Sequence, residues 1–108
     1  MHINTAITWL KVSSLEKTTL FILGSLHKAG REIWLSKKWL ADRAGCSRQW
    51  MYDVLESLDS QNFIECCEYS DGKYNIIVNE ELIIECGSVI FEEHSAVRKR
   101  GVRLSHKV

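Results

Sequence analysis

The sequence predicts a small α+β domain with a core of three helices, an antiparallel β-hairpin and a further segment at each end. Three observations predict this class. Apolar residues recur at helical spacing within residues 15–29 and again within 35–58. Two strand-like segments, 64–69 and 73–78, flank Ser70, Asp71 and Gly72, and Asp-Gly between such segments is a strong hairpin signal. A chain of 108 residues has room for one core of modest size.

The first helix of this core is expected at residues 15–29. Ser13 and Glu16 have the spacing of a capping box at its start, and Gly30 suits the cap at its end. Its inward stripe would consist of Leu15, Thr19, Ile22, Leu23 and Leu26. A short strand at 33–35 would follow and pair with the hairpin, giving a three-stranded sheet.

Residues 35–58 predict two short amphipathic helices joined by a tight turn. Ser36 can cap the first helix, Gly45 ends it, and Ser47 can cap the second. The apolar face of the pair comprises Leu40, Ala41, Ala44, Met51, Val54, Leu55 and Leu58. The opposite face of the second helix carries Arg48, Gln49, Tyr52 and Asp53.

The segment LADRAGCSRQWMYDVLESLDSQNFIE, residues 40–65, is similar to a pattern of winged helix-turn-helix proteins, L-A-x-x-x-G-x-S-x-x-T-V-x-x-x-L-x-x-L-x-x-x-G-L-I. That pattern is common in bacterial, plasmid and phage regulators and replication proteins. Asn62 stands at the pattern's glycine, and asparagine is the best substitute for glycine in a left-handed cap. Trp50 stands where threonine is frequent, and Asp53 where a basic or small polar residue is common. The resemblance is at the level of the fold and covers roughly residues 13–79.

The resemblance implies that double-stranded DNA is the partner. In winged-helix proteins that read the major groove, the first turn of the second helix contacts the bases, and Arg48 and Gln49 have the chemistry for guanine and adenine edges. Trp50 is expected to pack beneath the hairpin, with contact to a thymine methyl or a sugar as the alternative. The expected DNA-contacting residues are Lys37, Lys38, Ser47, Arg48, Gln49, Trp50, Tyr52, Lys73, Arg98, Lys99 and Arg100.

The charges of the chain do not decide between a DNA-binding function and a protein-interaction function. The chain has 14 basic and 14 acidic residues, so its net charge favours no class of partner. Asp53, Glu56 and Asp59 follow Arg48 and make the second helix net acidic, which suits a protein-interaction adaptor with exposed aromatic anchors. We expect a sequence-specific DNA-binding protein, a small bacterial or phage transcription regulator. A replication protein of a plasmid or phage and a protein adaptor are the alternatives.

The two ends are less determined. Residues 1–12 fit either a strand or a helical turn, and their apolar content predicts packing on the domain or on a second subunit. In the C-terminal extension, 80–108, the run 82–84 fits a strand or a helix, and a helix is expected to begin at Ser88 and to end before Gly101. A homodimer is expected through Ile83, Val89, Ile90 and Phe91, and completion of the monomer core is the alternative for the same residues.

Several classes of function are not expected. The four histidines are scattered, and the chain has no nucleophile motif and no glycine-rich phosphate loop, so we expect no enzyme and no cofactor. The cysteines form no C-x-x-C pair, and Cys66 and Cys67 would point to opposite faces of a strand, so no metal site is expected. One of these two would enter the core, and the other thiols would be partly buried. No apolar run approaches the roughly 20 residues of a membrane span, which predicts a cytoplasmic protein. The sequence indicates no effector ligand.

Overall fold

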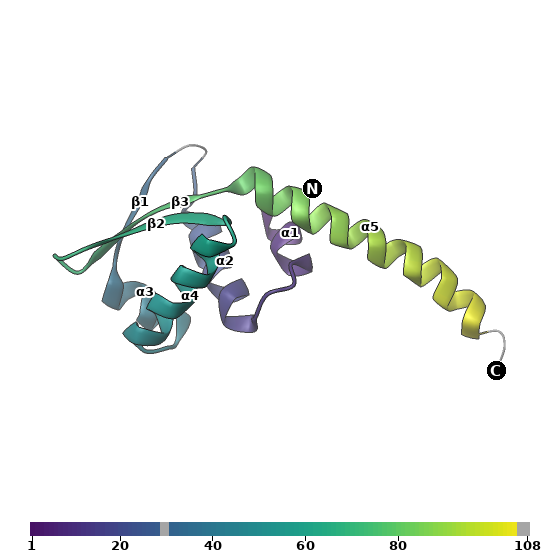
Figure 1. The fold of residues 1–108 in the computed structure, drawn as a ribbon, viewed down its shortest axis with the longest axis horizontal. Coiled ribbons are helices and arrows are strands. Elements are labelled where there is room, and N and C mark those ends of the chain that lie inside the picture. The colour runs from purple at the N-terminus through teal and green to yellow at the C-terminus, as the bar shows by residue number, and fades with distance from the viewer. Residues whose placement is uncertain (29–30, 106–108) are drawn as a thin grey trace.

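The computed structural model describes residues 1–28 and 31–105, with side chains described as far as Ala96. The described residues form five helices and three strands, which confirms the α+β class (Figure 1). In chain order these are α1 (Ile3–Trp9), α2 (Ser14–Leu26), β1 (Ile33–Ser36), α3 (Lys37–Ala44), α4 (Arg48–Ser60), β2 (Ile64–Tyr69), β3 (Lys73–Val78) and α5 (Glu80–Ser105).

Helix α2 begins as predicted and ends earlier. The Ser13 hydroxyl accepts from the Glu16 amide at 3.2 Å, and Glu16 accepts from the Ser13 amide at 3.0 Å, which completes the capping box. The helix ends at Leu26 with His27 as its cap, so the predicted end is wrong, and Gly30 lies outside the described residues. Leu26 is exposed, so the core position predicted for it is wrong, whereas Leu20 of the same helix is buried.

The α3–α4 pair forms as the sequence predicted. The hydroxyls of Ser36 and Ser47 cap the two helices, and Gly45 ends α3 in the left-handed conformation with a φ of 78°. The apolar stripe of α4 is fully confirmed, since each of its four predicted members is buried. Leu40 and Ala41 of α3 pack into the same core.

The sheet has the strand order β1-β3-β2 and is antiparallel throughout. Both hairpin strands have the predicted bounds. Asn62 has a φ of 66°, so the left-handed cap expected there is confirmed, and Gly72 in the hairpin turn is also left-handed with a φ of 84°. The inner face of the sheet buries Ile64, Ile76 and Val78 against the helices.

Helices α1 and α5 pack against each other beside this core. The first twelve residues contain a helix and no strand, and Ile3, Ala6 and Ile7 of α1 are buried. Because Gly87 of α5 has no side chain, the backbone of Ala6 comes so close that a Cβ on Gly87 would lie 2.6 Å from the Ala6 carbonyl oxygen.

Helix α5 is a single helix, so the predicted start at Ser88 and end before Gly101 are wrong. Asn79 caps it instead, because its side-chain oxygen accepts from the Leu82 amide at 3.3 Å and the run 82–84 lies in the first turns. Ile83 is fully buried in the monomer core, which is the alternative considered for it, so the interface predicted for Ile83 is wrong. The second half of α5 extends away from the rest of the chain (Figure 1). No helix among the described residues is both long and apolar enough to cross a membrane.

Candidate nucleic-acid interface

The exposed face of α4 carries the side chains that the sequence analysis assigned to it. Arg48, Gln49, Tyr52 and Asp53 are exposed, and the capping bond from Ser47 fixes the first turn, with its hydroxyl accepting from the Trp50 amide at 3.1 Å. The Ser47 hydroxyl is thereby engaged within the chain.

Trp50 is 62% exposed, so its predicted packing beneath the hairpin is wrong. Helical spacing explains the error. Residues 50 and 52 flank the buried Met51 on opposite sides of the helix axis, and Tyr52 is the one that faces the hairpin. The Trp50 ring therefore lies on the far side of α4 and is free to contact a partner.

Within α4, Asp53 engages one of the two candidate base-reading residues. The Gln49 side-chain amide donates to the Asp53 carboxylate at 3.2 Å, one helical turn away. Among the described residues the lysine or arginine side chain paired with a carboxylate is Lys37, with Glu68, so Arg48 carries an uncompensated positive charge at the start of the helix.

The predicted phosphate contacts differ in availability. Lys37 is largely covered, and its ammonium lies 2.8 Å from a Glu68 oxygen and 5.6 Å from the centre of the Tyr74 ring. That ion pair joins the first turn of α3 to β2, so a phosphate would have to displace Glu68 to reach Lys37. Lys38 and Lys73 are exposed. The side chains of Arg98, Lys99 and Arg100 lie outside the described residues.

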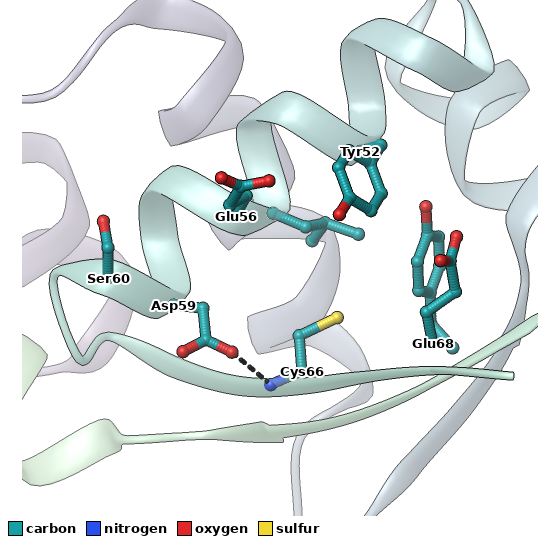
Figure 2. A pocket seen from close by; sticks show the side chains of 8 residues that line it. Tyr52, Glu56, Asp59, Ser60, Cys66 and Glu68 are labelled. Carbon is teal, nitrogen blue, oxygen red and sulfur yellow. Dashed lines mark hydrogen bonds between the residues drawn. The ribbon is translucent and has the colours of Figure 1, made fainter.

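A groove that the sequence analysis missed separates α4 from the hairpin (Figure 2). Its volume is about 400 Å³, and Tyr52, Glu56 and Asp59 line it from α4. Cys66 and Glu68 line it from β2. Asp59 accepts from the Cys66 amide at 3.0 Å and so ties the helix to the edge strand. The signal for it was the alternation of β2, because Glu68 shares the inward face with Ile64 and Cys66.

The pKa values of Tyr52, Cys66 and Tyr74, which line the groove, are raised. Burial, then the charge of Glu68, raises the pKa of Tyr74 to about 12. Burial, then Asp59, raises the pKa of the Cys66 thiol to about 12. The nearby carboxylates of Glu56 and Glu68 raise the pKa of Tyr52. Burial is the larger cause for Tyr74 and Cys66, and neighbouring carboxylates are the larger cause for Tyr52.

The four cysteines differ in their exposure to solvent. Cys46, Cys66 and Cys86 are partly buried, whereas Cys67 is exposed, so the partial burial expected for Cys67 is wrong. No group of His, Cys, Asp or Glu within the described chain could hold a metal ion.

Val89 and Phe91 are exposed on α5, and Ile90 is half-buried. The Phe91 ring meets Trp9 of α1 edge-on, with the ring centres 5.2 Å apart.

Comparison with known proteins assigns no relatives to this arrangement. No protein-family model matches the chain, and a search of curated proteins finds no match either. The function is therefore inferred from the residues themselves.

Proposed function

We propose that the chain is a winged-helix protein that binds double-stranded DNA in a sequence-specific manner, with α4 as the recognition helix. The order helix, strand, helix, turn, helix and hairpin supports this fold. The observation that carries the proposal is the exposed first turn of α4, where Arg48 and Gln49 stand on a helix whose other face is buried. Arginine and glutamine there have the geometry to read guanine and adenine in the major groove.

The flanking cations support the same orientation. Lys38 lies in the first turn of α3, and Lys73 begins β3 beside the hairpin turn. Both are exposed, and ammonium groups on either side of a recognition helix are suited to phosphate contacts that fix its position on the duplex. In this proposal they supply affinity, and the first turn of α4 supplies the choice of sequence.

The role we propose is that of a small transcription regulator of bacterial or phage type, acting as a homodimer. A DNA-binding role in plasmid or phage replication is the alternative, because the same domain serves both. Val89 and Phe91, which are exposed near the middle of α5, and the extension of the helix beyond them support self-association. A symmetric dimer would bind inverted half-sites about 10 base pairs apart or a multiple of that.

Selection of bound sequences from random duplex DNA tests the proposal, and an enriched motif is expected. Arg48→Ala should then weaken binding to the selected site by about 1 to 3 kcal/mol and relax one base preference. Arg31→Ala is the matched control, because it removes the same charge from an exposed position before β1. Failure to enrich any motif, or equal losses for the two variants, would contradict the proposed recognition helix.

A protein-interaction adaptor is the second candidate, and exposed aromatic residues favour it. Trp50 is joined by Trp34, which is exposed on the outer face of the sheet and lies 5.2 Å, centre to centre, from the Tyr69 ring. Aromatic side chains anchor protein interfaces. The same selection separates the two functions, since an adaptor enriches no DNA sequence.

A further inference from the structure

We propose that the carboxylate of Glu68 occupies an oxyanion site of this chain and that a backbone phosphate displaces it when DNA binds. The site is a second hollow, with a volume of about 290 Å³, which adjoins the groove at the first turn of α4. Its lining consists of Lys37, Arg48, Gln49, Tyr52, Glu68 and Tyr74. The part that DNA plays rests on the proposed function, whereas the site is defined by the chain alone.

The charges around the hollow favour an anion. Lys37 and Arg48 bring two cations to its lining, and among the described residues that line it Glu68 brings the one carboxylate. Asp53 and Glu56, on the exposed side of α4, are not part of this lining. When the Glu68 side chain turns out into solvent, two positive charges face the hollow, and they attract an oxyanion.

The Glu68 carboxylate marks the position that a phosphate would take. One of its oxygens lies 2.8 Å from the Lys37 ammonium, which is the distance of a charge-assisted hydrogen bond. Its charge also acts on two phenols. Glu56 and then Glu68 raise the pKa of Tyr52, and burial and then Glu68 raise the pKa of Tyr74 to about 12. Tyr52 and Glu68 lie at the same end of the groove (Figure 2).

Of the two partners in this ion pair, Glu68 is the one that is free to leave. Its side chain is 46% exposed, whereas that of Lys37 is 21% exposed. The Lys37 ammonium lies 5.6 Å from the centre of the Tyr74 ring, and its backbone amide donates to the Gly72 carbonyl at 2.9 Å. Lys37 therefore keeps its position when Glu68 turns away, and its ammonium is already placed for a new acceptor.

A duplex that binds as proposed supplies such an acceptor. Arg48 and Gln49, which we propose to contact bases, belong to the same lining as Lys37, so a strand whose bases they contact brings its backbone close to this lysine. An ion pair near the surface is weak, whereas a phosphate contact also releases counterions from DNA. Glu68 thus acts as an internal competitor that lowers the affinity for DNA without preventing binding.

The first experiment tests the oxyanion site without DNA. Inorganic phosphate is titrated, at constant ionic strength, into the full-length chain labelled with ¹⁵N. In Glu68→Gln it should shift the amide signals of Lys37, Arg48 and Tyr52 in a saturable manner, because the resident carboxylate is gone. The parent should bind phosphate at least about fivefold more weakly. Glu65→Gln is the matched control on β2, since Glu65 is exposed on the opposite face of the strand, and it should behave like the parent.

The second experiment tests displacement by DNA, with fluorescence anisotropy on one fixed duplex. Glu68→Gln should bind the duplex about two- to fivefold more tightly than the parent, and Glu65→Gln should not. Lys37→Met keeps the unbranched stem and removes the charge. It should make the dependence of log affinity on log salt shallower by about 0.9 units, because one phosphate contact is lost. In the Lys37→Met background, Glu68→Gln should give a smaller gain. The ¹⁵N spectra verify the fold of each variant.

The outcomes separate this proposal from the proposed function. Absence of saturable phosphate shifts in Glu68→Gln, or equal phosphate affinity in the parent, would overturn the site even if DNA selection enriches a motif. An unchanged salt dependence in Lys37→Met would mean that Lys37 stays with Glu68 on DNA, and equal gains for Glu68→Gln and Glu65→Gln would reduce the effect to net charge. Either result overturns the displacement. Phosphate binding in Glu68→Gln without duplex binding by any variant would support the site and contradict the proposed function.

Discussion

At the scale of single residues, Gly87 has the least room for a side chain among the glycines that the structure describes. A Cβ there would lie 2.6 Å from the Ala6 carbonyl oxygen and 2.8 Å from the Ala6 Cβ, so α1 would have to move. We expect Gly87→Ala to lower the free energy of unfolding by about 1 to 3 kcal/mol, as measured by urea denaturation. Gly24→Ala is the control, because its Cβ would meet only ordinary contacts at 3.7 and 3.8 Å. That variant should gain up to about 1 kcal/mol from helix propensity. Equal stability of the two variants would refute the close approach.

The buried acids of the groove predict a loss of stability at high pH. Folding raises the pKa of Cys66 from 9.0 to about 12 and that of Tyr74 from 10.0 to about 12. The unfolded chain therefore loses these protons at lower pH than the folded chain does. The contribution of these two groups to the free energy of unfolding is complete below pH 9. It decreases as the pH rises from 9 towards 12. Urea denaturation across this range should show a shallower decline for Cys66→Ala than for the parent, whereas Cys67→Ala, at an exposed position, should follow the parent.

Residues with local roles were predictable, and residues whose role depends on a distant neighbour were not. The caps at Ser13, Ser36 and Ser47 each depend on an amide three positions away, so sequence spacing identifies them. Trp50 was misplaced because its environment depends on which side of α4 the hairpin covers. Gly87 went unnoticed for a related reason, since its constraint comes from Ala6, far away in the sequence.

At the scale of elements, α4 combines the residues that we propose to contact bases with carboxylates that would repel DNA. Asp53 holds the Gln49 amide at 3.2 Å and adds a negative charge to the exposed face. Asp53→Asn keeps an acceptor for Gln49 and removes the charge, so duplex binding should strengthen by about 1 kcal/mol at low salt, with less gain as salt screens the interaction. Fluorescence anisotropy at two salt concentrations measures both effects. Glu81→Gln on α5 should show neither effect, and a similar gain there would mean that net charge alone is responsible.

Elements whose sequence signals lie within a few residues were predicted with correct bounds, whereas elements that depend on more distant residues were not. The hairpin strands had the predicted bounds because alternation and the Asp-Gly turn act within a few residues. Helix α5 was predicted to start too late, because the run 82–84 fits either period and the cap is Asn79, whose role is visible only once β3 has ended at Val78. Of the candidate site, the exposed turn of α4 was predictable. The groove was not, because it forms where α4 and β2 meet.

At the scale of the whole molecule, α5 divides into a packed half and an extended half. Its first half covers α1 and buries Ile83, and its second half extends beyond the other elements (Figure 1). Exposed apolar side chains are unfavourable in water, and pairing with a second copy would remove them from it. Val89 and Phe91 are the exposed apolar residues at the junction between the halves. This distribution is the physical reason for expecting a dimer.

Substitution of Phe91 tests the dimer, with a matched control on α2. Phe91 is 40% exposed and Phe21 is 37% exposed, so a charge at either position costs the monomer a similar amount. At a subunit interface an unpaired charge is strongly unfavourable, so Phe91→Glu should sediment as a folded monomer while Phe21→Glu sediments like the parent. Circular dichroism verifies the fold of both variants. An unfolded Phe91→Glu would mean that its contact with Trp9 stabilises the monomer core. Sedimentation of the parent chain as a monomer, free and on DNA, would remove the dimer and with it the expected spacing of half-sites.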